Sequence, residues 1–301
     1  MPEPQTPQDP PIPPLSARDE PRFRDLARKQ ALAGAFQEQG EHYDRLRPGY
    51  PDAVLEAILA RVPVREADGM ACGPRAVDLG AGTGKLSWAL VDRGLEVTAV
   101  DPSVAMLETA RRRDPSTATN AALPSAAARA PGPSAGTLTT RVATAEATGL
   151  PTGSAELVTV AQAWHWFDAR AASAEVARLL TAGGVLALVW NRLDVTIPWV
   201  HRLSRIMHAG DVHREDFRPT VGPELELRGR GVQQWEDPMP TQDVIDLART
   251  RSYVITAPAE RRARVFANLD WYLHEHLGHA PGSTIAVPYR TDWFMYRAVR
   301  G

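Results

Sequence analysis

A glycine-rich segment between a predicted strand and a predicted helix is the part of this sequence best suited to bind a ligand. Residues 76–84 read AVDLGAGTG. Glycine tolerates positive φ and lets a ligand approach the bare backbone. The helix expected after Gly84 offers unpaired N–H groups and the positive end of its dipole. The chemistry expected here is therefore recognition of a phosphate or a nucleoside.

Three classes of ligand use such a turn. A phosphate-binding P-loop requires G-x-x-x-x-G-K-[ST], but positions 79 and 86 are both leucine. A dinucleotide-binding turn requires G-x-G-x-x-G, and here the third glycine, Gly84, comes one residue early. The third pattern places an acidic residue two positions before G-x-G-x-G, as Asp78 and Gly80 do here. That pattern is typical of class I S-adenosylmethionine (SAM) methyltransferases.

A carboxylate at the end of the second predicted strand supports a nucleoside ligand. Asp101 lies 21 residues after Gly80, where it could accept hydrogen bonds from both ribose hydroxyls. NAD and SAM would both use such a residue. The alternative is that Asp101 caps the helix that begins after Pro102.

Further segments resemble the same class of enzyme. Residues 142–146, VATAE, followed by Leu150–Pro151, resemble the G-x-A-E-x-L-P motif at the adenine edge, with alanine at position 143 in place of glycine and a longer approach to Leu150. Residues 158–168, VTVAQAWHWFD, resemble a fourth strand that runs into an A-x-A-x-H-W-F-D loop. Residues 43–51, which include R-P-G-Y-P, and residues 288–291, PYRT, complete a likeness that covers positions from about 36 to 297.

The chain as a whole resembles the trans-aconitate and cantharidin methyltransferase-like branch of class I enzymes. The resemblance implies a Rossmann-like, doubly wound α/β fold with a seven-stranded sheet, six strands parallel and one antiparallel. It also implies that SAM lies over the carboxyl ends of the first two strands. The cofactor-binding residues expected from it are Arg47, Asp78, Gly80, Ala81, Gly82, Gly84, Asp101, Pro102, Thr144, Ala145, Glu146 and Gln162. Those expected to bind substrate are Tyr43, Trp164, Trp166 and Arg290.

His165 is the candidate catalytic residue, because it follows the fourth strand between two tryptophans. It could act as a base, donate a hydrogen bond to substrate, or pack in an aromatic cap over the cofactor. Trp164 and Trp166 could form walls that shield a sulfonium through cation–π contact, or could belong to the core. Arg47 could pair with the methionyl carboxylate of SAM or with an acidic substrate, or lie on the surface.

The elements that must position these residues alternate between strand and helix. Short apolar runs separated by helical stretches favour a parallel sheet covered on both faces. The expected strands are 75–79, 96–100, 140–144, 156–161 and 183–190, with later ones at 232–235 and 291–298. The expected helices are 52–61, 85–93, 103–113 and 171–180.

The domain organisation expected is a disordered Pro-rich tail over residues 1–22 and one methyltransferase domain over 23–301. An N-terminal helical cap precedes the sheet and a C-terminal helical elaboration follows it. Residues 114–138 are mostly Ala, Ser, Pro, Thr and Gly and are predicted to form a flexible surface insertion.

Composition and charge exclude several classes of binding partner. The net charge of −2 lacks the basic footprint of a dedicated nucleic-acid binder. The single cysteine, Cys72, excludes a disulfide framework and a Cys-cluster zinc site. His274–Glu275–His276 does not match the H-E-x-x-H zinc motif, so no metal is expected. No apolar run approaches the ~18 residues of a membrane span, and no signal peptide is expected. Arginines 261, 262 and 264 are interpreted as a solvated face rather than an RNA-binding patch.

The function predicted is transfer of a methyl group from SAM to a small organic acceptor, a carboxylate or a hydroxyl, in the cytoplasm. Two alternatives stay open at this stage. One is an NAD(P)-dependent oxidoreductase, which the glycine spacing and the lack of a Tyr-x-x-x-Lys pair after the fourth strand disfavour. The other is a protein that binds SAM without catalysis. The sequence does not indicate an oligomeric state.

Overall fold

The computed structural model describes residues 44–67, 70–112, 136–208 and 217–299. The tail expected over 1–22, Tyr43 and all but the last residues of the 114–138 segment lie outside the described residues. Nine strands are described: β1 (Arg65–Ala67), β2 (Met70–Cys72), β3 (Arg75–Leu79), β4 (Glu96–Asp101), β5 (Thr137–Val142), β6 (Ala155–Ala161), β7 (Leu180–Leu193), β8 (Leu225–Pro240) and β9 (Thr284–Ala298).

The described helices follow the strands in the expected alternation through α6 and then cluster in the C-terminal part. They are α3 (Asp52–Leu59), α4 (Lys85–Val91), α5 (Val104–Arg112), α6 (Ala169–Leu179), α7 (Pro198–Met207), α8 (Thr241–Leu247), α9 (Ser252–Ile255) and α10 (Ala259–Trp271). Single turns are also described at Trp164–Trp166 and Ala248–Thr250, both 3-10, and at Tyr272–His276, a π-helix.

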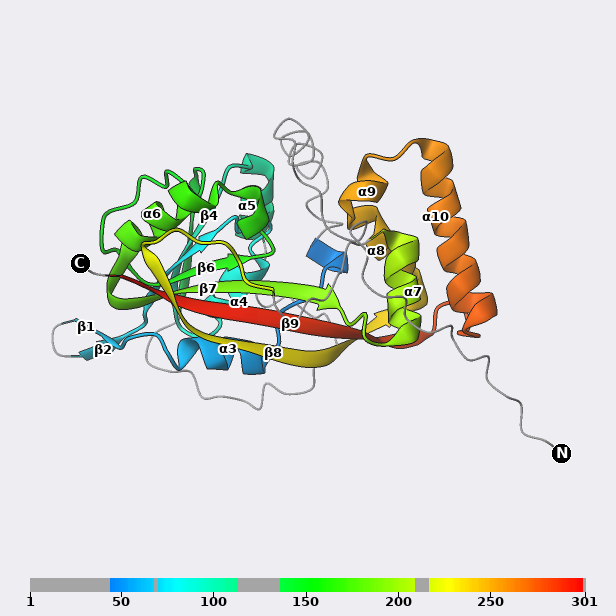
Figure 1. Cartoon of the computed structure of the whole chain (residues 1–301), viewed down its shortest axis with the longest axis horizontal. Coiled ribbons are helices and arrows are strands. Elements are labelled where there is room, and N and C mark those ends of the chain that lie inside the picture. The colour runs from blue at the N-terminus through cyan, green and yellow to red at the C-terminus, as the bar shows by residue number, and fades with distance from the viewer. Residues whose placement is uncertain (1–43, 68–69, 113–135, 209–216, 300–301) are drawn as a thin grey trace. The chain divides into compact units, whose positions relative to one another are not determined.

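A seven-stranded sheet in the order β5-β4-β3-β6-β7-β9-β8 carries the fold (Figure 1). Six of its strands are parallel and one is antiparallel, which confirms the predicted Rossmann-like architecture. The chain moves outward from β3 to β4 and β5 and then returns to pair β6 with β3. The order therefore reverses beside β3, and open α/β sheets bind ligands at the carboxyl ends of the strands at such a point.

Apolar strands and one-sided helices explain why these segments form layers. The first six residues of β6 are all buried, as expected for a strand covered on both faces. Leu55 of α3 and Leu90 of α4 belong to one buried cluster with Val97 and Leu157 of the sheet. Helix α4 connects β3 to β4, and α6 connects β6 to β7 in the opposite direction along the sheet. Since both crossovers are right-handed, the two helices lie on opposite faces. Figure 1 shows α3 and α6 on opposite sides of the sheet.

Several predicted boundaries were wrong. Strand β5 begins at Thr137 rather than residue 140, because Leu138 and Thr139 already pair with β4. Strand β8 begins seven residues before the predicted start at 232. This edge strand contains glycines, charged residues and alternating half-exposed side chains, so it has no apolar run by which its start could be predicted. Strand β9 begins at Thr284 rather than 291, and the β1–β2 hairpin was not predicted.

The described residues form two compact units, and the expected extent of the methyltransferase domain, 23–301, stays a prediction. One unit contains residues 44–191, 218–235 and 291–299 within the described ranges, and it holds most of the sheet. The other contains residues 192–208, 217 and 236–290, with helices α7, α8, α9 and α10.

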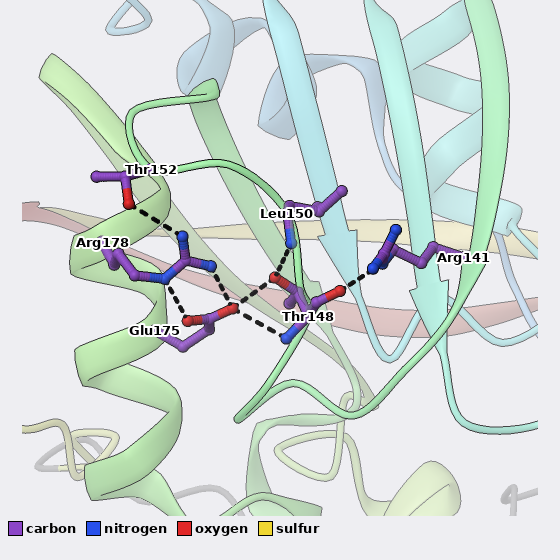
Figure 2. A network of polar contacts seen from close by, with 6 residues as sticks. All are labelled: Arg141, Thr148, Leu150, Thr152, Glu175 and Arg178. Atoms are coloured by element: carbon purple, nitrogen blue, oxygen red, sulfur yellow. Dashed lines mark hydrogen bonds and ion pairs between the residues drawn. The ribbon is translucent and has the colours of Figure 1, made fainter.

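A polar network in the larger unit fixes the loop that follows β5 (Figure 2). The buried Glu175 of α6 accepts hydrogen bonds from Thr148, at 2.9 Å from the backbone nitrogen and 2.5 Å from the hydroxyl. Arg178, one turn further along α6, donates to both oxygens of the Glu175 carboxylate at 2.7 Å. Arg141 of β5 donates to the carbonyl of Thr148. Thr148 therefore ties this loop to helix α6 through Glu175 and to strand β5 through Arg141.

The hydrogen bonds from Arg178 chiefly, together with those from Thr148, lower the pKa of Glu175 from 4.5 to about 2, although burial acts against them. Because the folded-state pKa lies below the ordinary value, the stability that Glu175 adds is present above pH 4.5. That stability is lost as the pH falls through about 2.

We predict that Glu175→Gln lowers the free energy of unfolding by roughly 3 kcal/mol at pH 7, at about 1.36 kcal/mol per pKa unit. At pH 3 the difference from the wild type should shrink to less than half of that. Urea titration at both pH values measures it. Glu108→Gln is the control, since Glu108 forms an exposed pair with Arg112 on α5 and should change stability by at most ~0.5 kcal/mol. Equal effects of the two substitutions would contradict the role assigned to Glu175.

Candidate functional site

The glycine turn after β3 has a left-handed backbone. The φ angles are 65° at Gly80, 55° at Gly82 and 76° at Gly84. The backbone nitrogens of Gly80 and Ala81 donate to the carbonyl of Val100 in β4, at 2.8 and 3.1 Å. A Cβ atom at Gly80 would lie 2.6 Å from the Cβ of Ala163, whereas one at Gly82 would have nothing within 4 Å. The turn is therefore closed on the Gly80 side and open above Gly82.

Asp101 at the end of β4 supports this turn directly. Its Oδ2 accepts from the backbone nitrogen of Gly82 at 2.9 Å, and its Oδ1 accepts from that of Ser103 at 2.8 Å. Burial raises the pKa of Asp101, and these two hydrogen bonds oppose the rise. The first turn of α5 is capped by Ser103, whose hydroxyl accepts from the nitrogen of Met106 at 3.3 Å. Each Asp101 oxygen keeps a second lone pair, so the carboxylate can still accept from a ribose.

Asp78 lies in the interior beneath the turn, with only 1% of its surface exposed. The hydroxyls of Ser87 and Thr159 donate to its two oxygens at 2.6 and 2.8 Å. Burial raises the pKa of Asp78 to about 6, although both hydroxyls act against the rise. The structure thus gives Asp78 contacts to α4 and β6, and direct contact with a cofactor stays a prediction.

The segment that contains Arg47 is held against the same turn. The ammonium group of Lys85, the first residue of α4, donates to the carbonyls of Asp44 and Arg47. Thr83 in the turn donates its hydroxyl to Asp44 at 2.9 Å. The partly buried Arg47 therefore lies near the start of α4, which suits its predicted role.

The loop after β6 approaches the turn from the other side. Gln162 adopts a φ of 58°, which is rare for a residue with a side chain. Its side-chain nitrogen donates to the carbonyl of Asn191 at 2.6 Å, and its backbone nitrogen donates to Val189 at 2.9 Å. Asn191 in turn donates to the carbonyl of Gly49 at 2.6 Å. Contacts at the ends of β6 and β7 thus hold Gln162 in this conformation.

The aromatic residues of this loop have different environments. Trp164 is 4% exposed, and its indole nitrogen donates to the carbonyl of Thr220 at 2.8 Å. It also packs edge-on against Phe167. His165 is exposed, and its ring centroid lies 5.0 Å from that of the half-buried Trp166. Of the three predicted residues, His165 and Trp166 are therefore more accessible to a ligand than Trp164.

The segment after β5 lies beside Asp101. The backbone nitrogen of Ala143 donates to the carbonyl of Asp101 at 3.3 Å, and a bridge joins Thr144 to Ala147. Ala145 is buried, while Glu146 accepts from the backbone nitrogen of Asp168 at 2.9 Å. Pro102 is exposed after β4. Thr144, Ala145 and Glu146 thus follow β5, at the same edge of the sheet as Asp101 and the glycine turn.

Arg290 is partly buried on β9 and belongs to the smaller unit, so the structure does not group it with these residues. Sequence reasoning missed Asn191 and Asp44. Asn191 directly follows the apolar run predicted as strand 183–190, much as Asp101 follows the run 96–100, and that signal could have identified it.

Within the described residues, no group of three or more His, Cys, Asp and Glu is placed to hold a metal ion. No helix in that part of the chain has the length and apolar character that a membrane span requires.

Comparison with known proteins identifies the family. Residues 77–188 match the model of a methyltransferase domain. An uncharacterized methyltransferase of Mycobacterium tuberculosis is 38% identical over 250 residues, covering 83% of this chain and 89% of that protein. The chain belongs to the class I SAM-dependent methyltransferases. A second uncharacterized methyltransferase, from Schizosaccharomyces pombe, is 26% identical to this methyltransferase over 76% of its chain and 82% of the relative.

A solved structure supports the fold of this methyltransferase. A candidate type II methyltransferase from Anaeromyxobacter dehalogenans is 28% identical, with a TM-score of 0.54 over 84% of this chain and 97% of that one. SAM is accordingly the cofactor. The open backbone at Gly82 and the spare lone pairs of Asp101 are compatible with a nucleoside at the ends of β3 and β4.

We predict that Gly80→Ala destabilises the protein by ~1–3 kcal/mol, because it adds both an unfavourable φ and a collision with Ala163. Gly153→Ala is the matched control, since Gly153 has a φ of 63° but nothing within 4 Å of a Cβ. It should show the φ penalty alone. Thermal unfolding of both variants measures the difference. If Gly153→Ala were as destabilising as Gly80→Ala, the close packing at Ala163 would have no energetic role.

Proposed function

We propose that this methyltransferase methylates a small organic acceptor at a carboxylate or hydroxyl oxygen, and that it belongs to the trans-aconitate and cantharidin methyltransferase-like branch. The observation that carries the proposal is the close packing of Gly80 against Ala163. It brings the loop with His165 and Trp166 beside the glycine turn. The branch assignment is supported by the motifs at residues 47–51 and 158–168.

The cofactor supplies an electrophilic methyl group on a sulfonium, and the protein must orient and desolvate the acceptor. We infer that Asp101 accepts from the ribose hydroxyls and that Arg47 pairs with the methionyl carboxylate. Glu146 and Gln162 are then assigned to the adenine edge and to the floor of the acceptor site. Trp166 supplies an apolar wall beside the sulfonium. Tyr43 and Arg290 stay in the proposal as substrate-binding residues on the resemblance alone.

The acceptor decides what His165 does. A carboxylate is already ionised at neutral pH and needs no base, whereas a hydroxyl must lose its proton. The exposed position of His165 suits a residue that donates a hydrogen bond to an incoming acceptor. We therefore assign it orientation of the substrate rather than base catalysis. The net charge of −2 and the single cysteine support a small-molecule acceptor rather than a nucleic acid, and a cytoplasmic location.

The cofactor site is tested by Asp101→Ala. Loss of two hydrogen bonds to a charged acceptor should weaken binding of S-adenosylhomocysteine by ~1.5–3 kcal/mol, as isothermal titration calorimetry would measure. Glu96→Gln changes a carboxylate at the opposite end of the same strand, where it pairs with Arg65, and should leave affinity unchanged. Unchanged affinity in a folded Asp101→Ala protein would place the ribose elsewhere.

The acceptor is sought by incubating the protein with SAM and a cell metabolite extract and identifying methylated products by mass spectrometry. With that acceptor, His165→Ala should raise KM while kcat changes little, because an orienting hydrogen bond is lost. His165→Asn, which keeps a donor, should partly restore KM. A fall in kcat of ~10²-fold or more that is partly rescued at high pH would instead show that His165 is a base.

A further inference from the structure

The smaller unit contains a hollow of about 480 Å³. Helices α7, α9 and α10 surround it, and α10 packs against both of the others (Figure 1). That volume lies within the range of small-molecule sites. The charged and aromatic residues that line it include Arg202, Arg205, His208, Tyr253, Arg261 and Arg264. We call this site the arginine hollow.

The arginines of the hollow come from two helix faces. Arg202 and Arg205 are three positions apart on α7, and Arg261 and Arg264 are three positions apart on α10. Residues at this spacing share one side of a helix. Because α7 packs on α10, the four arginines line one space between the two helices. Arg262, which lies between the two arginines of α10, does not line it.

Positive charge dominates the lining. None of the described lining residues is acidic. The carboxylate of Glu260 pairs with Arg264 at 3.0 Å, in a contact where both side chains are largely exposed.

Two aromatic rings give the hollow a rigid side. The His208 and Tyr253 rings stack with their centroids 4.0 Å apart. The guanidinium of Arg261 lies 3.4 Å from the Tyr253 hydroxyl. Partial burial lowers the pKa of His208, and the positive charges of Arg205 and Arg261 lower it further.

We propose that the arginine hollow binds a small organic anion with at least two negative charges, carried on carboxylate or phosphate groups. Arginine presents a planar fork of donors that matches both groups in bidentate pairs. Four like charges around one space repel one another, and an anion of multiple charge relieves that repulsion more fully than a monovalent ion. The proposal concerns the smaller unit by itself and does not depend on the acceptor of the methyl transfer.

The test is calorimetric titration of the full chain with two probes, pyrophosphate and citrate, with acetate and chloride as controls at matched ionic strength. We expect saturable binding of at least one probe and none of the controls. Binding of citrate alone identifies a carboxylate ligand, binding of pyrophosphate alone identifies a phosphate ligand, and binding of both indicates a general oxyanion site. No saturable binding of either probe, or equal responses to acetate, would overturn the proposal.

Variants locate the binding. The double variant Arg261→Gln/Arg264→Gln should weaken the bound probe at least tenfold. Arg262→Gln, which removes one positive charge from a neighbouring position on α10, should change affinity less than twofold at matched ionic strength. Equal weakening by both would mean that the probe responds only to overall charge, and the proposal would fail. If the double variant does not fold, Arg205→Gln on α7 replaces it, with the same tenfold criterion.

Binding of S-adenosylhomocysteine, measured on the same proteins, separates this proposal from the proposed function. It should be unchanged in the double variant, because Arg261 and Arg264 belong to the smaller unit. A wild-type protein that binds S-adenosylhomocysteine but neither probe would refute the anion site alone.

Discussion

The backbone nitrogens of Gly80 and Ala81 both donate to the carbonyl of Val100, and that of Gly82 donates to Asp101. These bonds hold a left-handed turn that would be strained with any side chain at Gly80. They also link the carboxyl ends of β3 and β4. The same geometry keeps the backbone above Gly82 open and positions the Asp101 carboxylate next to that opening. The cofactor site therefore depends on hydrogen bonds that are internal to the sheet edge.

A second set of polar contacts connects the loop after β6 to strands β7, β9 and β8. Gln162 donates to Asn191, Asn191 donates to Gly49, and Thr291 of β9 donates to the Asn191 side chain at 2.7 Å. Trp235 of β8 donates to the Thr291 hydroxyl at 2.9 Å. The loops proposed to surround the acceptor are thus tied to strands far apart in the sequence. A buried polar network of this kind gives a loop one defined conformation when its members are satisfied.

Much of the fold and the cofactor site could be predicted because their signals are local. The glycines after β3 and the carboxylate at the end of β4 stand at fixed distances from apolar strands, so Gly82 and Asp101 could be identified from sequence. The supporting contacts could not, because they join residues distant in the chain. Asn191 reaches Gly49 across 142 positions, and Thr159 reaches Asp78 across 81. The predicted wall residue Trp164 is largely buried, and no sequence pattern distinguished it from Trp166. The early starts of β8 and β9 were missed because Gly229, Gly231 and Pro288 interrupt the apolar pattern on which strand prediction depends.

The central claim is that the turn and Asp101 form a site for the SAM nucleoside rather than for a dinucleotide. The most direct measurement is calorimetric titration of the wild-type protein with S-adenosylhomocysteine, NAD and ATP under one set of conditions. We predict saturable binding of S-adenosylhomocysteine with one site per chain, and little heat from NAD or ATP. Tighter binding of NAD than of S-adenosylhomocysteine would contradict it.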